Sequence, residues 1–407
     1  MTTTVAPPSL ETLRLLWCQA LLDEIDGAIT LRHRLHARPS LSGEEEPAAL
    51  VLEEALGIPM ERTAVTGRVG RVGPGDGPAV LLRAELDALP VREATGAAYA
   101  SLDGHMHACG HDVHQAALVA VVRAARHLDL PVGLVPLLQP REETYPSGAK
   151  DAVDSGVLSR YAVSAAIGAH VHPTVPLGTV ATGAGVVNAA ADELEIVLRG
   201  RGGHGAYPHH AADPVAAVAH VVLALPEVLR RTVSPMRPST LSVGHLQAGR
   251  ASANVLPSEA RLLATMRTTD ARDRRRIQEE VRRMATSQAA AFGLEAEVTV
   301  TAGEPVLFND PDLVERMDRW LERAGVEVTE PMRSLGADDF SFFGEVVPSV
   351  MSFVGVQVAG HDEPPPLHHA QFLPTDDAVL QVATALMSGY LAAAELARPE
   401  LGEPDDF

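Results

Sequence analysis

The sequence predicts an α/β protein with a mainly parallel sheet flanked by helices, plus a smaller inserted α+β domain. Two observations support this fold class. In the first and last parts of the 407-residue chain, short apolar segments alternate with segments of helical spacing, as in strands joined by crossover helices. In the middle of the chain, the segments alternate polar and apolar residues, as half-exposed strands do. We therefore expect a main domain in two parts, residues 1–189 and 303–407, around an inserted domain at residues 190–302.

Four short apolar runs predict the buried strands of the main domain. They lie at residues 80–82, 132–138, 165–171 and near 350–354. The segment from residue 111 to about 128 is rich in Ala and Val and predicts a helix between the first two strands. Two strands joined by a helix predict parallel pairing, with the strand ends on one side of the sheet.

The inserted domain shows the signals of helix starts and ends as well as alternating strands. Asp213 and Pro214 open a helix that runs to about residue 231, and Asp270 opens a second helix that ends at Gly293. The order strand, helix, strand, strand, helix, strand resembles the ferredoxin-like split βαβ arrangement. The strands are expected at residues 193–198, 240–246, 259–268 and 295–300.

Composition limits the partners that we expect. The chain has 33 Lys and Arg against 53 Asp and Glu, a formal charge of −20, so phosphate backbones and anionic membranes should repel it. We see no apolar run approaching the ~20 residues of a membrane span and no secretory signal. The only cysteines, Cys18 and Cys109, are too few for a disulfide framework. We expect a cytoplasmic protein with no nucleic-acid or membrane partner.

Residues 105–114 hold the densest group of side chains that can bind a metal. Four histidines, one cysteine and one aspartate fall within these ten residues. Thiolate and imidazole groups together favour zinc or a related divalent ion. Cys109 and His111 are one residue apart, so in an extended stretch both would point the same way and bind one ion or neighbouring ions. The alternative is a small buried cysteine among surface histidines.

Two adjacent carboxylates, Glu142 and Glu143, follow the predicted strand at residues 132–138. Open α/β sheets build their sites at the carboxyl ends of parallel strands. Because neighbouring side chains diverge, one carboxylate can hold a metal ion while the other takes a proton from the attacking water. A solvated acidic turn is the alternative interpretation of such a pair.

Two further histidines complete a set of candidate ligands. His170 lies near the end of the strand at residues 165–171, and His368 follows a run of three prolines that stiffens its loop. One or two divalent ions could bind to this set, and two ions would need a bridging thiolate or carboxylate. The set consists of Cys109, His111, Glu143, His170 and His368.

Other enzyme classes fit these residues less well. No Gly-x-Ser-x-Gly element is present for a serine hydrolase. His111 and Asp112 suggest an HD-type phosphohydrolase, but the further His and Asp positions of that class are not visible. Cys109 could act as a nucleophile beside a histidine. A thiolate among so many metal-binding side chains is more typical of a metal ligand.

Several short motifs, taken in order, cover nearly the whole chain. They lie at residues 83–90, 107–114, 139–143, 168–171, 200–204, 208–209, 213–214, 254–257, 267–268, 336–340 and 367–368. Together they resemble the metal-dependent aminoacylase/carboxypeptidase superfamily. The resemblance is to its amidohydrolase branch, which contains bacterial hippurate hydrolases and plant auxin–amino-acid conjugate hydrolases.

This resemblance assigns roles to residues of the main domain. It implies that this domain is catalytic and that the five candidate ligands form a two-metal site, with Cys109 in the bridging place. Glu142 matches the general base of the family. Asp87 matches an acid that orients a side chain bound to the metal. The ions would be zinc, or manganese, cobalt or nickel.

The resemblance also assigns a role to the inserted domain, which would be a lid and dimerisation domain of a homodimer. His204 matches a histidine that polarises the scissile carbonyl, often from the partner subunit of a dimer. Asn254 and Arg267 match lid positions that hold the substrate's carboxylate, for which the bidentate geometry of Arg is suited. The lid would close over the substrate and exclude water.

The implied activity is metal-dependent hydrolysis of the amide bond of N-acyl amino acids or related small amides. Water at the metal would attack the carbonyl, with Glu142 as general base. A dipeptidase or a carboxypeptidase acting on short peptides is the alternative on the same scaffold, and a non-enzymatic binding relative is a third possibility. Two departures affect the substrate: residues 144–148 replace the branch's usual run of glycines, and Val113 replaces its usual Gly.

Overall fold

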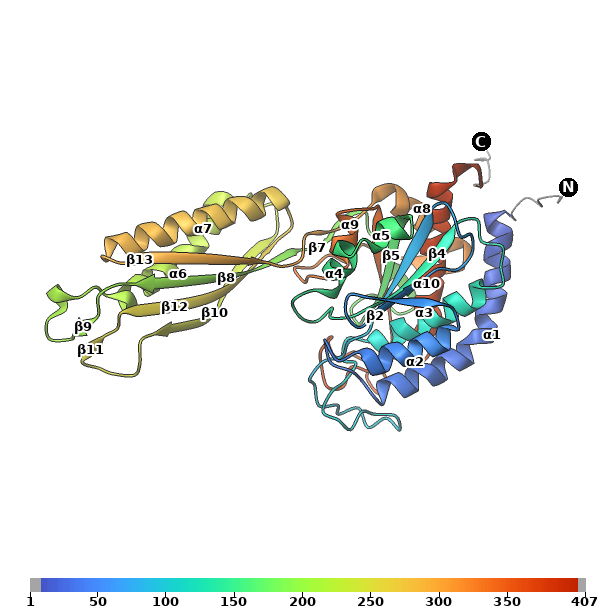
Figure 1. Cartoon of the computed structure of the whole chain (residues 1–407), viewed down its shortest axis with the longest axis horizontal. Coiled ribbons are helices and arrows are strands. Elements are labelled where there is room, and N and C mark those ends of the chain that lie inside the picture. The colour runs from blue at the N-terminus through green and yellow to red at the C-terminus, as the bar shows by residue number, and fades with distance from the viewer. Residues whose placement is uncertain (1–8, 402–407) are drawn as a thin grey trace. The chain divides into compact units, whose positions relative to one another are not determined.

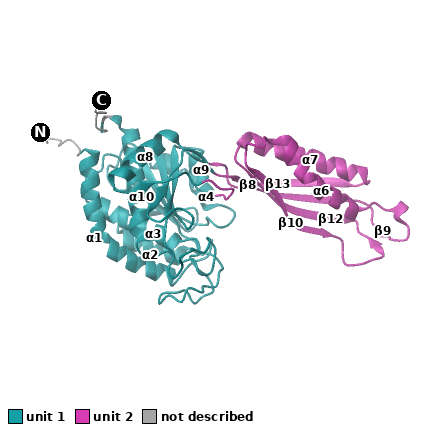
Figure 2. Cartoon of the chain, turned by 180° about the vertical axis from the view of Figure 1, so that it is seen from behind, with its two compact units in different colours: residues 1–187, 308–332, 339–407 teal, residues 188–307, 333–338 magenta. Residues whose placement is uncertain are grey.

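The computed structural model describes residues 9–401, which fold into two compact units (Figure 2). Unit 1 comprises residues up to Val187 together with Phe308–Met332 and the chain from Asp339 onward. Unit 2 comprises Asn188–Leu307 and Arg333–Asp338. Unit 2 therefore contains the segment 190–302 that we expected as an insertion, and also residues 333–338, which we expected in the main domain.

Unit 1 is built on an eight-stranded sheet with the order β1-β2-β4-β3-β5-β16-β6-β15. Its four central strands, β4, β3, β5 and β16, are parallel, so the predicted fold class is confirmed. All residues of β3, β4 and β16 are buried, as expected for continuous apolar runs covered on both faces. The strands are β1 (Met60–Thr63), β2 (Gly67–Gly70), β3 (Ala79–Glu85), β4 (Gly133–Gln139), β5 (Val163–His172), β6 (Thr179–Ala181), β15 (Glu327–Val328) and β16 (Ser349–Gly355).

Two layers of helices cover this sheet (Figure 1). One layer consists of α1 (Leu10–His36), α2 (Glu46–Leu56), α3 (His111–Ala125), α8 (Pro311–Arg323) and α10 (Ala378–Ala397), which pack on one another. The other contains the short helices α4 (Gly148–Asp154), α5 (Val157–Arg160) and α9 (Ser341–Gly344). A short 3-10 turn, Pro399–Leu401, follows α10. One large apolar core joins the first layer to the sheet.

Helix α10 is long and apolar enough to cross a membrane by length and composition. It is the one helix of residues 9–401 that meets this test, and 72% of its most apolar window is buried inside the protein. The expectation that no apolar run approaches ~20 residues was therefore wrong for this segment. The helix packs against β5 and α3 as a core helix of unit 1.

Unit 2 is a four-stranded antiparallel sheet with the order β10-β12-β8-β13, covered on one face by α6 and α7. The alternating strands point their apolar residues toward these helices, where they form a second core. Asp213 and Asp270 cap the two helices with their side chains, as predicted. The elements are β8 (Ala190–Arg199), α6 (Pro214–Thr232), β10 (Ser239–Ala248), β12 (Glu259–Thr268), α7 (Ala271–Ala291) and β13 (Glu295–Ala302).

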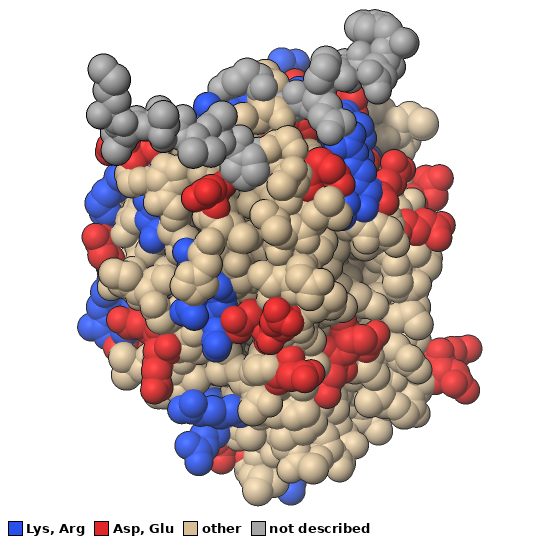
Figure 3. Space-filling model, turned by 90° about the vertical axis from the view of Figure 1, so that its right-hand side faces the viewer, with Lys and Arg blue, Asp and Glu red and all other residues tan. Residues whose placement is uncertain are grey.

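Smaller elements complete the fold. The strands β9 (Gly203–His204) and β11 (Val255–Leu256) form a small ribbon in unit 2, followed by a 3-10 turn at Pro208–His210. The strands β7 (Gly185–Asn188) and β14 (Leu307–Asn309) pair where the chain passes between the units. Acidic and basic side chains are interspersed over the face of unit 1 shown in Figure 3.

Candidate metal centre and active site

The candidate site lies in unit 1, where three parallel strands end side by side. The register pairs Glu85, the last residue of β3, with Gln139, the last residue of β4. On the other side of β3, strand β5 carries His170 near its own end. The segments that follow β3 and β4 contain Asp87 and the Glu142–Glu143 pair, so the sheet gathers these side chains at one edge, as open α/β sheets do.

Cys109 and His111 enter the site through a sharp turn rather than an extended stretch. Gly110 between them has a φ of +83° and forms the N-cap of α3, whose first residue is His111. A side chain at Gly110 would also meet Val171 Cγ2 at 2.4 Å. The expected extended geometry was therefore wrong, because a glycine in the left-handed region opens the helix there. The turn still brings both side chains to the same place.

The imidazoles of His111 and His170 are each held through Nδ1. His111 Nδ1 donates to the carbonyl of Asp87 at 2.8 Å, and His170 Nδ1 donates to the carbonyl of Val171 at 2.7 Å. Burial lowers the pKa of His170 well below its usual value, so this ring presents an unprotonated Nε2, and His111 does the same in its neutral form. His170 Nε2 lies 3.4 Å from Cys109 Sγ, and the buried Nε2 of His111 has no hydrogen-bond partner among the described residues.

Glu143 and His368 complete the group. His368 Nε2 lies 3.3 Å from Glu143 Oε1, and one ligand atom from each of Cys109, His111 and Glu143 lies within 4.8 Å of the others. Burial acts to raise the pKa of Glu143, but the contact with His368 and the nearby His111 outweigh it and lower that pKa. The carboxylate is therefore ionised, as a metal ligand must be.

The structure thus brings all five predicted ligands together. Their donor set of one thiol, three imidazoles and one carboxylate suits a divalent ion of the zinc type. The buried Nε2 of His111, which has no hydrogen-bond partner among the described residues, is a ring nitrogen that a bound cation would satisfy in the neutral form of the ring. The residues therefore fit a divalent metal centre.

His114 lies close to this group but cannot join it through either nitrogen. Its ligand atom falls within 4.8 Å of those of Glu85, His111 and His170. However, His114 Nε2 accepts from the backbone N–H of Val171 at 3.0 Å, and its Nδ1 donates to Glu85 at 2.8 Å. Both nitrogens are occupied, so His114 serves to orient its neighbours.

Glu142 faces the group from the side. One of its carboxylate oxygens lies 3.9 Å from His111 Nε2, and its side chain is 13% exposed. Glu142 and Glu143 therefore diverge as the sequence suggested: Glu143 points at His368, while Glu142 remains accessible beside the unpartnered nitrogen of His111. A water between Glu142 and a cation at that nitrogen would lie within reach of the carboxylate.

Asp87 links the segments that follow β3 and β4. Its carboxylate accepts from Ser42 Oγ at 2.6 Å and from the backbone N–H of Glu143 at 3.0 Å. Its carbonyl, rather than its carboxylate, is the closer partner of His111 Nδ1, at 2.8 Å against 3.8 Å. Burial raises the pKa of the Asp87 carboxyl group.

A buried network of hydrogen bonds supports the start of the loop after β4. The sequence did not indicate a role for the residues of this network. Asp339 accepts from Arg83, Gln139 and Ser147, each at 2.8 Å. Arg83 also pairs with Glu85, the partner of His114. Arg83, Gln139 and Asp339 all fall in the family motifs, but only their contacts in the structure show that they form one hydrogen-bonded network.

Comparison with known proteins identifies the family. The profile of peptidase family M20/M25/M40 matches residues 81–392. The chain belongs to peptidase family M20/M25/M40.

Relatives in this family are named for amide hydrolysis. An N-acetylcysteine deacetylase of Bacillus subtilis (strain 168) is 33% identical over 367 residues, covering 88% of this chain and 93% of that protein. An N-acetyldiaminopimelate deacetylase of Geobacillus sp. (strain WCH70) is 30% identical over 376 residues, covering 90% of this chain and 98% of that protein. The chain is accordingly a hydrolase of the amidohydrolase type, as the sequence predicted.

A solved structure of a relative described as metal-binding shows the same fold. The YXEP protein of Bacillus subtilis, described as a dinuclear metal-binding peptidase of the M20 family, aligns with a TM-score of 0.77 and 29% identity. The alignment covers 91% of this chain and 98% of that chain. A divalent metal centre is therefore supported for this M20 protein by a relative as well as by its own residues.

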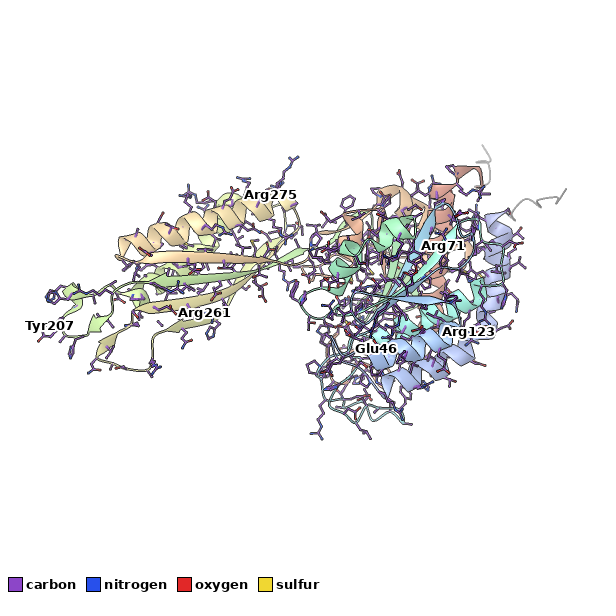
Figure 4. The ribbon with its side chains drawn as sticks, viewed as in Figure 1. Glu46, Arg71, Arg123, Tyr207, Arg261 and Arg275 are labelled. Atoms are coloured by element: carbon purple, nitrogen blue, oxygen red, sulfur yellow. The ribbon has the colours of Figure 1, made fainter. Side chains whose placement is uncertain are left out.

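The remaining predicted residues of this M20 protein lie in unit 2. His204 is exposed on β9 and pairs with Val255 of β11, directly after Asn254. This ribbon borders a cavity of about 960 Å³ that His204, Arg250 and Arg261 help to line. Figure 4 labels Tyr207 at this end of unit 2 and Arg275 of α7 at the other.

Arg267 lies far from this ribbon within unit 2. It is near the last residue of β12, whereas the ribbon adjoins the first, Glu259. Eight residues of strand correspond to roughly 26 Å. Unit 2 of a single chain therefore cannot bring Asn254 and Arg267 to the same substrate carboxylate.

Proposed function

We propose that this protein hydrolyses the amide bond of N-acyl amino acids, releasing a carboxylic acid and the free amine. The observation that carries the proposal is the position of Glu142 beside a buried group of metal-binding side chains. Relatives named as deacetylases of acetylated amino acids support the substrate class.

The residues divide the chemistry between them. Cys109, His111, Glu143, His170 and His368 would hold one or two divalent ions, either zinc or manganese, cobalt or nickel. When bound, a divalent ion lowers the pKa of water and polarises a carbonyl. Glu142 takes a proton from the attacking water and returns it to the leaving amine, as a general base and then a general acid.

In the proposal, Asp87 orients two of the metal ligands, His111 and Glu143. Its carbonyl fixes the tautomer of His111, and its carboxylate holds the backbone N–H of Glu143. The bulky segment 144–148 next to the base includes Tyr145, which is 48% exposed, so this segment is suited to shape the acyl pocket.

We also propose that the protein is a homodimer in which unit 2 serves as lid and dimerisation domain. Strand β10 is an edge strand with most residues exposed, and α6 packs beside it. Val215, Ala219 and Leu223 form an exposed apolar stripe on α6 at a spacing of four residues. Exposed apolar stripes and open strand edges are surfaces that a second copy covers.

The charge of unit 2 permits such self-association. It contains 15 Arg and 14 Asp or Glu, so almost none of the net charge of −20 resides there. Because His204 and Arg267 lie at opposite ends of unit 2, a second copy is a natural source of one of them. In the proposal His204 polarises the scissile carbonyl from the partner subunit, while Asn254 and Arg267 bind the substrate's carboxylate group from two subunits.

A substrate panel tests the proposed activity. Acyl-amino acids, side-chain-acylated lysines, dipeptides and longer peptides would be assayed before and after chelation, and after each metal is restored. We expect cleavage of acyl-amino acids that chelation abolishes and a divalent ion restores. Faster cleavage of dipeptides, or release of C-terminal residues from longer peptides, would favour the peptidase alternative. No cleavage together with less than half an equivalent of bound metal would favour a binding role.

A further inference from the structure

The loop that carries Glu142 and Glu143 is closed at its base. The backbone N–H of Gly148 donates to the carbonyl of Arg141 at 3.1 Å. A side chain at position 148 would meet the carbonyl oxygen of Pro140 at 1.6 Å, so only glycine fits there. Both candidate catalytic carboxylates therefore project from a small closed loop, and their directions depend on the backbone at Arg141.

Arg141 adopts an uncommon backbone conformation. Its φ is +50°, in the left-handed region that residues other than glycine seldom occupy. Such a conformation persists only where the surroundings fix it, and it is frequent at functional sites. The side chain of Arg141 contacts Asp151 and donates to the carbonyls of Ala64 and Pro146, which accounts for the side chain but not for the backbone.

The backbone of Arg141 is held by Glu45. Glu45 Oε1 accepts from the N–H of Arg141 at 2.9 Å and from the N–H of Gly43 at 2.8 Å. Its Oε2 accepts from Thr66 Oγ1 at 2.7 Å, and the residue is 0% exposed. The carboxylate forms no ion pair with the described residues, so neutral donors alone satisfy a fully buried acid.

A buried carboxylate without a cationic partner is costly to keep, so its role follows from what it holds. The turn that contains Glu45 also contains Ser42, whose hydroxyl donates to Asp87 at 2.6 Å. The same short segment thus contacts both the residue before Glu142 and the acid that holds Glu143. We propose that Glu45 is a positioning residue, which fixes the Arg141 backbone and so aims Glu142 and Glu143. This inference rests on the proposed function.

Two substitutions separate this role from a role in folding alone. In Glu45→Gln, the amide oxygen can accept from both N–H groups and the NH₂ can donate to Thr66, so all three hydrogen bonds are possible. In Glu45→Ala, all three are lost. Glu44→Ala is the matched control, because the neighbouring Glu44 is exposed.

The experiment uses the full-length enzyme with three readouts. They are kcat and KM on the best acyl-amino acid, the affinity of the metal-free protein for Co²⁺, and amide hydrogen exchange of the peptide covering residues 140–148 without metal. For Glu45→Ala we expect kcat or Co²⁺ affinity to fall about 10- to 100-fold with KM changed only a few-fold, and faster exchange in that peptide. Glu45→Gln should stay within about threefold of the wild type, and Glu44→Ala should match it.

The outcomes that would overturn the inference are specific. A folded Glu45→Ala protein with unchanged exchange at residues 140–148, or with kcat and Co²⁺ affinity equal to those of Glu44→Ala, would show that Glu45 does not position the loop. If Glu45→Ala does not fold, Glu45→Asp retains the charge but shortens the reach to Arg141, and the same readouts apply. A wild type that cleaves no acyl-amino acid would contradict the proposed function, while the exchange data would still decide the role of Glu45.

Discussion

His111 Nε2 lies 3.9 Å from a carboxylate oxygen of Glu142, and this nitrogen has no hydrogen-bond partner among residues 9–401. Glu143, the next residue, turns instead to His368 at 3.3 Å. Two adjacent glutamates therefore face different groups. Glu142 lies beside the unpartnered nitrogen of His111, whereas Glu143 is paired with His368. Their substitutions should have different consequences.

Glu142→Ala should retain bound metal but lose about two to four orders of magnitude in kcat, as expected for the loss of a general base. Glu143→Ala should lose metal as well as activity, because Glu143 is a proposed ligand. The measurement pairs steady-state kinetics with metal analysis of each variant. Turnover near the wild-type rate in Glu142→Ala would remove this residue from the mechanism.

Cys109→Ala should lower the affinity for divalent ions by at least about tenfold, because the sulfur atom in contact with His170 leaves the donor set. Cys18→Ala is the control, since Cys18 lies on α1 against Met387 and outside the site. Competition with a chromophoric chelator gives both affinities. Equal affinities of the two variants would exclude Cys109 as a ligand.

Leu223→Glu should shift the protein from dimer to monomer, because it places a charge in the exposed apolar stripe of α6. Leu223 is 77% exposed, so the substitution should not disturb the core. Leu15→Glu, at a 55% exposed position on α1, is the matched control. Sedimentation velocity of both variants would decide, and a monomeric wild type would contradict the dimer directly.

Mixing two inactive variants tests whether His204 acts across the dimer. Subunits with Glu142→Ala and subunits with His204→Ala would be unfolded, mixed in equal amounts and refolded. If His204 serves the partner's site, half of the dimers are mixed and each has one complete site, so about a quarter of wild-type activity should return. Recovery of no activity from verified mixed dimers would place His204 in its own subunit's site.

Stability should fall as the pH rises from about 6.5 to 9, because of His36. Burial acts to lower the pKa of His36, but hydrogen bonds and charges from Asp112 and Glu93, at 3.1 and 3.2 Å, outweigh it and raise that pKa to about 9. A group with a raised native pKa contributes stability that is complete below its unfolded value of about 6.5 and is lost through pH 9. The shift corresponds to roughly 3 kcal/mol at most.

Urea unfolding of the metal-free protein across this range measures the effect. His36→Gln should be less stable than the wild type at pH 6 and should show a flatter decline toward pH 9. Parallel curves for the two proteins would show that His36 is not charged in the native state.

Local sequence patterns predicted much of the fold. The strand at residues 259–268 and the helices capped by Asp213 and Asp270 were found where expected, because alternation and capping are local properties. The turn at Gly110 was missed, since a left-handed glycine and an extended one look alike in sequence. The position of residues 333–338 in unit 2 was not predicted, because it depends on contacts with distant segments.

The candidate site was predictable to a similar extent. The five proposed ligands have distinctive chemistry, so their residue types and family motifs drew attention to them. Glu45 and Asp339 carry ordinary carboxylates, and their contacts with Arg141 and Gln139 span 96 and 200 residues of sequence. Only the fold brings such pairs together, so no local pattern could indicate what they hold.

The hydrogen bond from His111 to position 87 ends on a carbonyl, which every amino acid possesses. Replacing Asp87 would therefore leave the imidazole's anchor in place and remove the acceptor for the Glu143 amide and the Ser42 hydroxyl. A substitution at position 87 can therefore disturb the loop after β4 while the ring of His111 keeps its orientation. In natural variants that lack the carboxylate of Asp87, we expect Glu143 to be displaced and the ring of His111 to stay in place.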